Sequence, residues 1–494
     1  MHNKCIKSSR KAGRGFERFC RLSEAYIREG FYLNRNCAVI LAAGEGKRMK
    51  SKKPKVLCEI LFRPMLDWVL SAVEEAGVEN ACVITGHKRE QVEEHLGGRY
   101  RTAVQDDKGY GTGYAVQQAA GFLRENAGGS VLILCGDAPM IDAATIRGAL
   151  ELHEREGNSV TVITARIANP AGYGRIVRTA DGALSAIVEQ NDADEAALRI
   201  NEVNSGAYWF RTDDLLSVLF EIGNGNEKGE YYLTDAVGLL VRRGLRAGAF
   251  TAATEEVIYG ANDKVQMQEL NERMRRRILE RWMRAGVDIP CADGVMIGGE
   301  VSLGADTVIL PGTVLRGKVV IGEDCEIGPN TLVENSTVGN GVKLNNVQCY
   351  QSVIEDRAKL GPFVHIRPNS RLCEEVYLGD FVEVKNSTLG KGAHASHLTY
   401  IGDSDVGEKV NFGCGTVTVN YNGMTKARCT IGNNAFIGCN TNLVAPVKIG
   451  DFGYTAAGST ITEDVPDYTL AISRAKGQVN KVNYVKEKNM IKKK

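Results

Sequence analysis

The sequence predicts two folds in one chain: an α/β domain with a mainly parallel sheet, followed by a parallel β-helix. Two observations support this prediction. From residue 37 to about 262, short apolar runs alternate with amphipathic stretches, as in parallel sheets that helices cover on both faces. From about residue 295, apolar residues recur every six positions and glycine often follows them. That period is typical of a β-helix, whose coils have three short strands and tight corners.

The first half contains clear strand and helix patterns. The expected strands are "CAVILAAG", "ACVITG" and "SVLILCGDAP". The expected helices are "PMLDWVLSAVEEAG", which ends at Gly77, "REQVEEHL" and "GTGYAVQQAAGFL". Ligands of parallel sheets bind at the carboxyl ends of the strands, where "LAAGEG" and "CGDAP" both fall. We therefore expect an α/β domain over residues 37–264 with its site at this edge of the sheet.

A different pattern links the two halves. Within residues 265–285, apolar residues recur at roughly helical spacing among arginine and glutamate, which predicts a single exposed linker helix; they are Met267, Leu270, Met274, Ile278 and Met283. The β-helix is expected over residues 286–494. Its recurring apolar positions are Ile297, Leu303, Ile309, Leu315, Ile321, Ile327 and Val333, then Leu360, Ile366, Leu372 and Leu378, then Ile431, Ile437, Leu443 and Ile449. An ordinary sandwich is the alternative, but sandwiches do not keep a strict six-residue step over so many repeats.

Composition narrows the class of protein. The chain has 494 residues, 24% of them charged, with a formal net charge of +1, so that any anion binding has to be local and a nucleic-acid partner is not expected. The 13 cysteines are scattered without metal-like spacing, which favours free thiols in the cytoplasm. No apolar run approaches the roughly 20 residues of a membrane helix, so no membrane partner is expected.

Both ends of the chain are basic. Residues 1–36 lack the apolar centre of a signal peptide, and we expect a disordered extension outside the fold, either native or a result of start-site choice. The final "KEKNMIKKK" is expected to be a solubilising tail, with attraction of an anionic ligand as the alternative.

The stretch "LAAGEGKRMKSKKPKVL" combines a glycine-rich turn with many cations at the end of a strand. Such a turn lets backbone N–H groups approach phosphate oxygens, which Arg48 and Lys55 can then pair with. A solvated basic loop is the alternative that the residues alone leave open.

This stretch resembles the signature of sugar-nucleotide pyrophosphorylases. With the hexapeptide half behind it, the chain from 37 to 494 resembles the bifunctional N-acetylglucosamine-1-phosphate uridylyltransferases/glucosamine-1-phosphate acetyltransferases. The resemblance implies a Rossmann-like nucleotidyltransferase domain and a left-handed parallel β-helix that assembles as a homotrimer. It also implies two reactions for cell-wall precursor supply. Acetyl-CoA would acetylate glucosamine 1-phosphate, and UTP with Mg²⁺ would then uridylylate the product and release pyrophosphate.

The resemblance assigns the uridylyl site residue by residue. Arg48 and Lys55 would act on the phosphates, and Asp137 and Asn262 would hold the metal, although a lone aspartate after a strand is often a helix cap. The substrate-binding set is Leu41, Ala42, Ala43, Gly44, Lys55, Gln105, Gly111, Thr112, Gly174, Glu189, Asn204 and Asn262. Two features depart from the family pattern: the loop between Gln105 and Gly111 is one residue longer, and Cys135 replaces a frequent aromatic residue.

The acetyltransferase residues carry over in the same way. His397 in "SHLTYIGD" would be the general base, since the amine must lose a proton to react, and Glu383 would orient it. His365 and His394 are competitors for that role. The sugar-phosphate set is Arg367, Lys385, Tyr400 and Asn411. The acetyl-CoA set is Cys414, Asn420, Tyr421, Cys439, Ala457 and Arg474, with the two cysteines where the family has small residues.

Two other functions fit parts of the pattern. A nucleotidyltransferase with a single activity would use its β-helix only to trimerise, and would lack the set around His397. A non-enzymatic subunit of a translation-factor type shares both domains, and would lack Arg48, Lys55 and Asp137. All these residues are present, which favours the enzyme with two activities.

Overall fold

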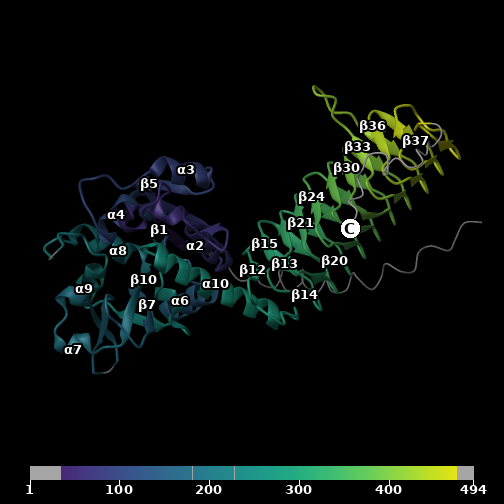
Figure 1. Ribbon diagram of the computed structural model, residues 1–494. Helices are drawn as coiled ribbons and strands as arrows, with labels where there is room; N and C mark the ends of the chain where they lie inside the picture. The colour runs from purple at the N-terminus through teal and green to yellow at the C-terminus, as the bar shows by residue number, and fades with distance from the viewer. Residues whose placement is uncertain (1–34, 181, 227, 476–494) are drawn as a thin grey trace, which may run out of the picture. The chain divides into compact units, whose positions relative to one another are not determined.

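The computed structural model describes residues 35–475, except 181 and 227, so that most of the expected basic extension and the basic tail lie outside the described residues. The chain forms two compact units (Figure 1). The first reaches Leu270, and the second begins at Asn271 and also includes Leu61–Arg63. None of the helices in the described ranges is both long and apolar enough to cross a membrane.

The first unit is built on one mixed sheet with the strand order β11-β7-β10-β6-β1-β4-β5, and with β8 and β9 attached beside β10. The strands are β1 (Cys37–Leu41), β4 (Asn80–Thr85), β5 (Arg101–Val104), β6 (Ser130–Cys135), β7 (Val160–Arg166), β8 (Arg175–Arg178), β9 (Leu184–Val188), β10 (Glu202–Arg211) and β11 (Ala247–Thr251). The expected strands after residues 36, 80 and 129 are confirmed. Strand β10 runs antiparallel to β6 and β7, so the sheet is mixed.

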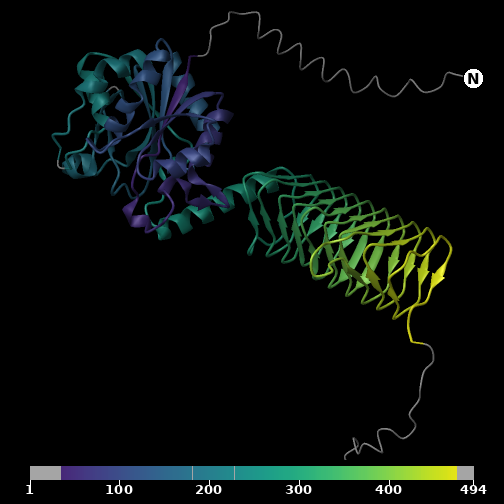
Figure 2. The same cartoon turned by 90° about the horizontal axis from the view of Figure 1, so that it is seen from above.

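Helices pack on both faces of this sheet (Figure 2). They are α2 (Met65–Glu75), α3 (Arg89–Leu96), α4 (Thr112–Gln118), α5 (Ala120–Glu125), α6 (Ala143–Arg155), α7 (Glu195–Leu198), α8 (Thr212–Val218) and α9 (Thr234–Arg242). Strand β1 shows why both faces need cover: Ala38 and Ile40 belong to one apolar core, and Cys37 and Val39 to the other. The helix expected over "GTGYAVQQAAGFL" is interrupted at Ala119, which separates α4 from α5.

The expected linker helix is α10 (Lys264–Arg284), but it is not exposed all round. Leu270, Met274, Ile278 and Leu279 are buried, whereas Met283 is exposed. The spacing that marks a helix also collects its apolar side chains on one face, and that face is buried.

The second unit is a parallel β-helix of three sheets, which confirms the predicted fold class. The first sheet contains β12 (Met296–Ile297), β15 (Val314–Arg316), β18 (Leu332–Glu334), β21 (Val347–Tyr350), β24 (Val364–Ile366), β27 (Glu383–Lys385), β30 (Tyr400–Gly402), β33 (Val417–Val419), β36 (Asn442–Val444) and β39 (Thr460–Ile461). The second contains β13 (Val301–Leu303), β16 (Val319–Ile321), β19 (Thr337–Val338), β22 (Val353–Ile354), β25 (Arg371–Leu372), β28 (Thr388–Leu389), β31 (Ser404–Val406), β34 (Cys429–Ile431) and β37 (Val447–Ile449). The third contains β14 (Val308–Ile309), β17 (Glu326–Ile327), β20 (Lys343–Leu344), β23 (Lys359–Leu360), β26 (Tyr377–Asp380), β29 (His394–His397), β32 (Asn411–Phe412), β35 (Phe436–Ile437), β38 (Tyr454–Thr455) and β40 (Leu470–Ala471).

The six-residue step places one apolar residue of each strand inside the coil. Ile297, Leu315 and Val333 are paired in register on successive coils of the first sheet, and each is fully buried. The coils are regular until β33, where Val419 is followed by a segment that returns to the helix at Cys429. Met424 in this segment is 88% exposed, so the segment projects from the β-helix.

Candidate active sites

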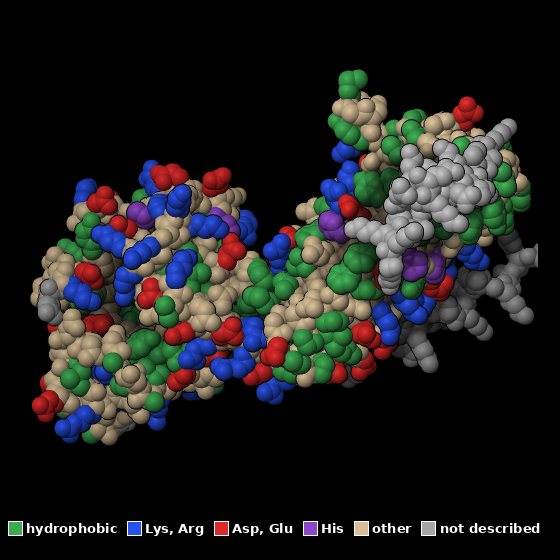
Figure 3. Space-filling model, viewed as in Figure 1, with side chains coloured by type: hydrophobic (Ala, Val, Ile, Leu, Met, Phe, Trp, Pro, Cys, Tyr) green, Lys and Arg blue, Asp and Glu red, His purple; other side chains and the backbone are tan. Residues whose placement is uncertain are grey.

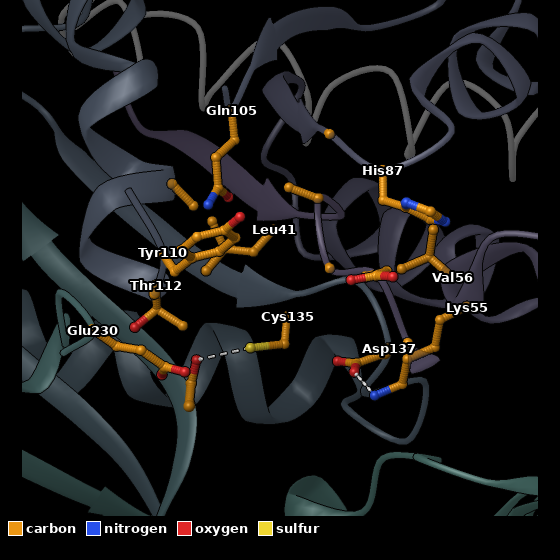
Figure 4. A pocket seen from close by; sticks show the side chains of 18 of the residues that line it. Leu41, Lys55, Val56, His87, Gln105, Tyr110, Thr112, Cys135, Asp137 and Glu230 are labelled. Carbon is orange, nitrogen blue, oxygen red and sulfur yellow. Dashed lines mark hydrogen bonds and ion pairs between the residues drawn. The ribbon is translucent and has the colours of Figure 1, made fainter. Parts of the chain in front are cut away.

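The first unit contains a cavity of about 1420 Å³ at the carboxyl edge of β1 and β6. Most of the expected uridylyl-site residues line it: Leu41, Ala43, Gly44, Arg48, Lys55, Gln105, Gly111, Thr112, Asp137, Glu189, Asn204 and Asn262. In Figure 4, Gln105, Tyr110 and Thr112 lie on one side of this cavity, and Lys55 and Asp137 on the other. Ala42 is buried and is not among the lining residues, and neither is Gly174.

Lys55 lies at the centre of the cationic side. Its Nζ is 2.5 Å from Oδ2 of Asp137 and donates to Oδ1 of Asn262 at 2.8 Å. The side chains of Lys55 and Asp137 are only 12% and 29% exposed, so their charges interact in a partly dry environment. The turn before it requires glycine: Gly46 has φ +61°, and a Cβ there would be 2.8 Å from the Cβ of Lys55.

On the opposite side of the cavity, the backbone of residues 111–113 is in close contact with the backbone at Tyr231. Gly111 has φ +109°, and a Cβ there would lie 2.4 Å from the carbonyl oxygen of Tyr231. Gly113 N–H donates to that same oxygen at 2.8 Å. The hydroxyl of Thr112 accepts from Leu233 N–H at 3.1 Å, and Gln105 donates to the carbonyl of Gly109 at 3.2 Å. These contacts hold the loop after Gln105 in a defined shape.

Glu189 and Asn204 come from the antiparallel part of the sheet. Glu189 accepts from the Thr234 hydroxyl at 3.3 Å, and burial raises the pKa of its carboxyl. Asn204 donates to the Tyr208 hydroxyl at 2.6 Å and accepts from Gly206 N–H at 3.0 Å. Gly174 accepts from Asn204 N–H at 2.9 Å, so it acts on this side through backbone.

Several residues that line the cavity were not expected from the sequence, among them His87, Lys88, Tyr110, Gln190 and Glu230. The first two follow β4 as the glycine-rich turn follows β1, and this position at a strand end was the available signal. Lys88 also ties two loops together, because its ammonium donates to the carbonyl of Lys52 at 2.9 Å. Nothing local to Glu230 or Gln190 marks them in the sequence.

The residues around Lys55 fit a divalent cation. Asp137 and Asn262 present oxygen atoms that converge on one ammonium, so two hard donors face a single point. Mg²⁺ is usually held by one or two protein oxygens together with substrate phosphates. Within the described ranges, no cluster of three or more histidine, cysteine or acidic residues is suited to hold a metal.

The second unit places the expected acetyltransferase residues on two of its three sheets. On the first sheet, Lys385 lies 3.4 Å from Asp403, and Asn420 donates to Asp403 and, at 3.4 Å, to the Tyr400 hydroxyl. Arg367 donates to Glu383 at 2.9 Å. Tyr421 lies in the projecting segment and is 55% exposed. The first sheet and the projecting segment thus gather Lys385, Tyr400 and Asn420 around one carboxylate.

The other expected residues lie on or beside the third sheet. His397 is exposed at the end of β29, in register with Asp380 of β26. The carboxylate of Glu383, expected to orient His397, is engaged by Arg367 of its own sheet. Asn411 is in register with His394, one coil from it.

The three acetyl-CoA positions with small side chains are neighbours on successive coils. The carbonyl of Cys414 accepts from Asn440 N–H at 2.7 Å, and that of Cys439 accepts from Gly458 N–H at 2.8 Å. Arg474 then donates to the carbonyl of Ala457 at 2.8 Å. Cys414, Cys439, Ala457 and Arg474 are therefore brought together, with Cys439 exposed.

Comparisons with known proteins agree with both units. The nucleotidyl transferase family model matches residues 37–283, and the bacterial transferase hexapeptide model matches residues 300–335. The bifunctional protein GlmU of Acetivibrio thermocellus is 46% identical over 454 residues, which are 92% of this chain and 98% of that protein. Its counterpart from Caldanaerobacter subterraneus is 49% identical and covers 91% of this chain and 98% of its own length. A Clostridium botulinum relative of the same name is 43% identical over 93% of this chain and all of its own. The chain therefore belongs to the GlmU family of bifunctional proteins, which join a nucleotidyltransferase to a hexapeptide-repeat acetyltransferase.

Proposed function

We propose that the cavity of the first unit performs uridylyl transfer and that the cluster on the second unit performs acetyl transfer. The chain is a bifunctional enzyme of UDP-N-acetylglucosamine synthesis. It acetylates glucosamine 1-phosphate with acetyl-CoA, and then joins the product to the uridylyl group of UTP. The observation that carries the residue-level proposal is the convergence of Asp137 and Asn262 on the ammonium of Lys55.

In uridylyl transfer, a phosphate oxygen of N-acetylglucosamine 1-phosphate attacks the α-phosphorus of UTP, and pyrophosphate leaves. Lys55 and Arg48 bring together and neutralise two anions that otherwise repel each other. Gly111, Thr112 and Gln105 hold the uracil, while Glu189 and Asn204 hold the amino sugar. Nucleotidyl transferases of this family use a divalent metal, and here Asp137 and Asn262 would hold Mg²⁺, which neutralises phosphate charge when bound.

In acetyl transfer, the amine of glucosamine 1-phosphate attacks the thioester carbonyl of acetyl-CoA. His397 accepts the proton that the amine loses, and the coenzyme A thiolate leaves. Arg367 and Lys385 bind the sugar phosphate, Tyr400 and Asn411 position the sugar, and Glu383 has an orienting role. Cys414, Asn420, Tyr421, Cys439, Ala457 and Arg474 form the acetyl-CoA side.

This arrangement supports a homotrimer. The proposed acetyltransferase residues are divided between two sheets of one chain, and a neighbouring copy can complete the site in a groove between the chains. Exposed, stacked aromatic pairs on the coil corners, such as Phe363 with Phe381, suit packing between copies. We place the enzyme in the cytoplasm, where UTP and acetyl-CoA are available, and all eleven described cysteines are free thiols. Basic and acidic side chains are interspersed on the visible surface in Figure 3, as expected for an enzyme of small molecules.

Two assays test the proposal. Thiol release from acetyl-CoA with glucosamine 1-phosphate, and pyrophosphate release from UTP with N-acetylglucosamine 1-phosphate, should both proceed with the purified chain. Thiol release alone should survive Lys55→Ala, and pyrophosphate release alone should survive His397→Ala. Absence of thiol release would favour a single-activity nucleotidyltransferase, and absence of both would favour a non-enzymatic subunit.

A further inference from the structure

One corner of the β-helix carries a column of residues with left-handed backbone. Its members are Gly317, Asn335, Gln351, Asn369, Asn386 and Asp403, with φ between +43° and +71°. Backbone N–H groups join successive members to the coil before them: Asp403 N–H, for example, donates to the carbonyl of Lys385 at 2.9 Å. The column therefore changes from glycine and amide side chains to a carboxylate at one position, Asp403.

The backbone does not explain this change. Asparagine and aspartate both adopt the left-handed region more readily than other non-glycine residues, so an amide would satisfy the corner at position 403 as it does at 386. The carboxylate of Asp403 is also costly there, because the residue is only 4% exposed and a buried charge needs partners. The charge at this corner must serve something other than the turn.

The partners of Asp403 include two residues of the proposed acetyltransferase site. Its Oδ2 lies 3.4 Å from Nζ of Lys385 and also accepts from the Asn420 amide. Its Oδ1 accepts from the Asn386 amide at 2.5 Å. One carboxylate thus joins β27, the corner that follows β27 and the start of the projecting segment. The Asn420 amide also donates to the Tyr400 hydroxyl at 3.4 Å, so a third residue of the proposed site belongs to this network.

The charges around this carboxylate are mostly positive. Lys426 lies in the projecting segment. The neighbouring Lys385 lowers the pKa of Lys426, and the charge of Arg367 acts in the same direction. Burial would raise the pKa of Asp403, but hydrogen bonds from Asn386 and Asn420 and the charge of Lys385 hold it below its usual range. The carboxylate is therefore ionised and offsets part of a cationic cluster.

We propose that Asp403 is a positioning residue of acetyl transfer, which holds the Lys385 ammonium in place for the phosphate of glucosamine 1-phosphate. The proposal rests on the role given above to Lys385. Asp403 acts through this side chain, so its loss should weaken binding of the phosphorylated sugar more than the chemical step. An interaction made equally in the ground and transition states changes KM while kcat is kept.

The experiment compares Asp403→Asn, Lys385→Ala and the double variant in the full-length enzyme. Asp403→Asn should raise the KM for glucosamine 1-phosphate about tenfold, with kcat within threefold and the KM for acetyl-CoA within twofold of wild type. The double variant should be no worse than Lys385→Ala, since Asp403 then has no ammonium to place. Asp356→Asn is the matched control, because Asp356 is a corner carboxylate that accepts Asn340 N–H at 2.8 Å and touches no proposed ligand.

The outcomes separate this inference from the proposed function. If Lys385→Ala raises the KM and Asp403→Asn does not, or if the two effects add fully, Asp403 has no positioning role. If Lys385→Ala leaves the KM unchanged, the role of Lys385 fails, and this inference fails with it. Should Asp403→Asn not fold, Asn386→Gly removes one hydrogen bond to Asp403 while glycine keeps the left-handed corner. It should raise the same KM about threefold, and an unchanged KM would again overturn the proposal.

Discussion

Replacing Asp137 by asparagine should separate the two activities. The substitution keeps the size of the side chain and removes one negative charge from a partly buried pair, in which Nζ of Lys55 is 2.5 Å from the carboxylate. Lys55 keeps its hydrogen bond to Asn262 at 2.8 Å, so the local geometry should survive. What is lost is the anion that holds Lys55 and would hold a divalent cation.

The magnitude follows from the burial of the pair. Removing one electrostatic group of an active site costs about 3–4 kcal/mol of transition-state stabilisation. Because the two side chains remain 12% and 29% exposed, we take the lower end. At about 1.4 kcal/mol for each factor of ten, kcat/KM for uridylyl transfer should fall by about two orders of magnitude. High Mg²⁺ should recover part of the loss, because the weakened site can still be filled by mass action.

The assay is pyrophosphate release at several Mg²⁺ concentrations, with thiol release from acetyl-CoA measured on the same preparation. Thiol release should stay within twofold of wild type, since Asp137 and His397 belong to different compact units. Asp142→Asn is the matched control: Asp142 is nearby, caps α6 through Thr145 N–H at 2.7 Å and does not line the cavity. Uridylyl transfer within threefold of wild type, or a parallel loss of both activities in a folded variant, would refute this account of the site.

Three further changes test other parts of the molecule. His397→Ala should lower acetyl transfer by roughly 10²–10⁴-fold and spare uridylyl transfer. Mixing His397→Ala with Arg474→Ala protomers should restore activity if the two residues come from different copies. A fully active monomer would contradict the trimeric site. N-ethylmaleimide should inhibit acetyl transfer through the exposed Cys439. It should not inhibit uridylyl transfer, because burial raises the pKa of Cys135 to about 12. Acetyl transfer by Cys439→Ala should resist the reagent, and equal sensitivity of this variant and wild type would exclude the Cys439 thiol. Burial would raise the pKa of Glu202, but hydrogen bonds from Arg178 and Thr164 hold it below its usual range, so the stability that it contributes is present above the unfolded-state pKa of roughly 4.3 and is lost as the pH falls through the folded-state pKa. The stability of the first unit, measured by denaturant unfolding, should therefore fall more between pH 6 and pH 3 in wild type than in Glu202→Gln. Identical profiles would remove Glu202 from this role.

Local pattern was sufficient for most of the secondary structure. Helix α3 has the expected bounds, Arg89–Leu96, because its apolar spacing and flanking residues agree. The expected helix over 111–123 was wrong in its continuity, and the antiparallel direction of β10 was not anticipated. The exposure of α10 was also misjudged, since helical spacing shows which side chains share a face and not whether something covers that face.

The sequence by itself determined the order of the two folds, the family resemblance and the chemistry available at each strand end. These depend on near neighbours: a glycine-rich turn beside cations, or an apolar residue at every sixth position. Tertiary structure alone decided that Lys55 meets Asn262, a residue 207 positions away, and that the backbone at Tyr231 makes Gly111 necessary. It also gathered Lys385, Asn420 and Asp403 from separate coils. Such contacts form when coils stack and strands pair across long sequence separations, and no local pattern records which distant side chains will then lie within hydrogen-bonding distance.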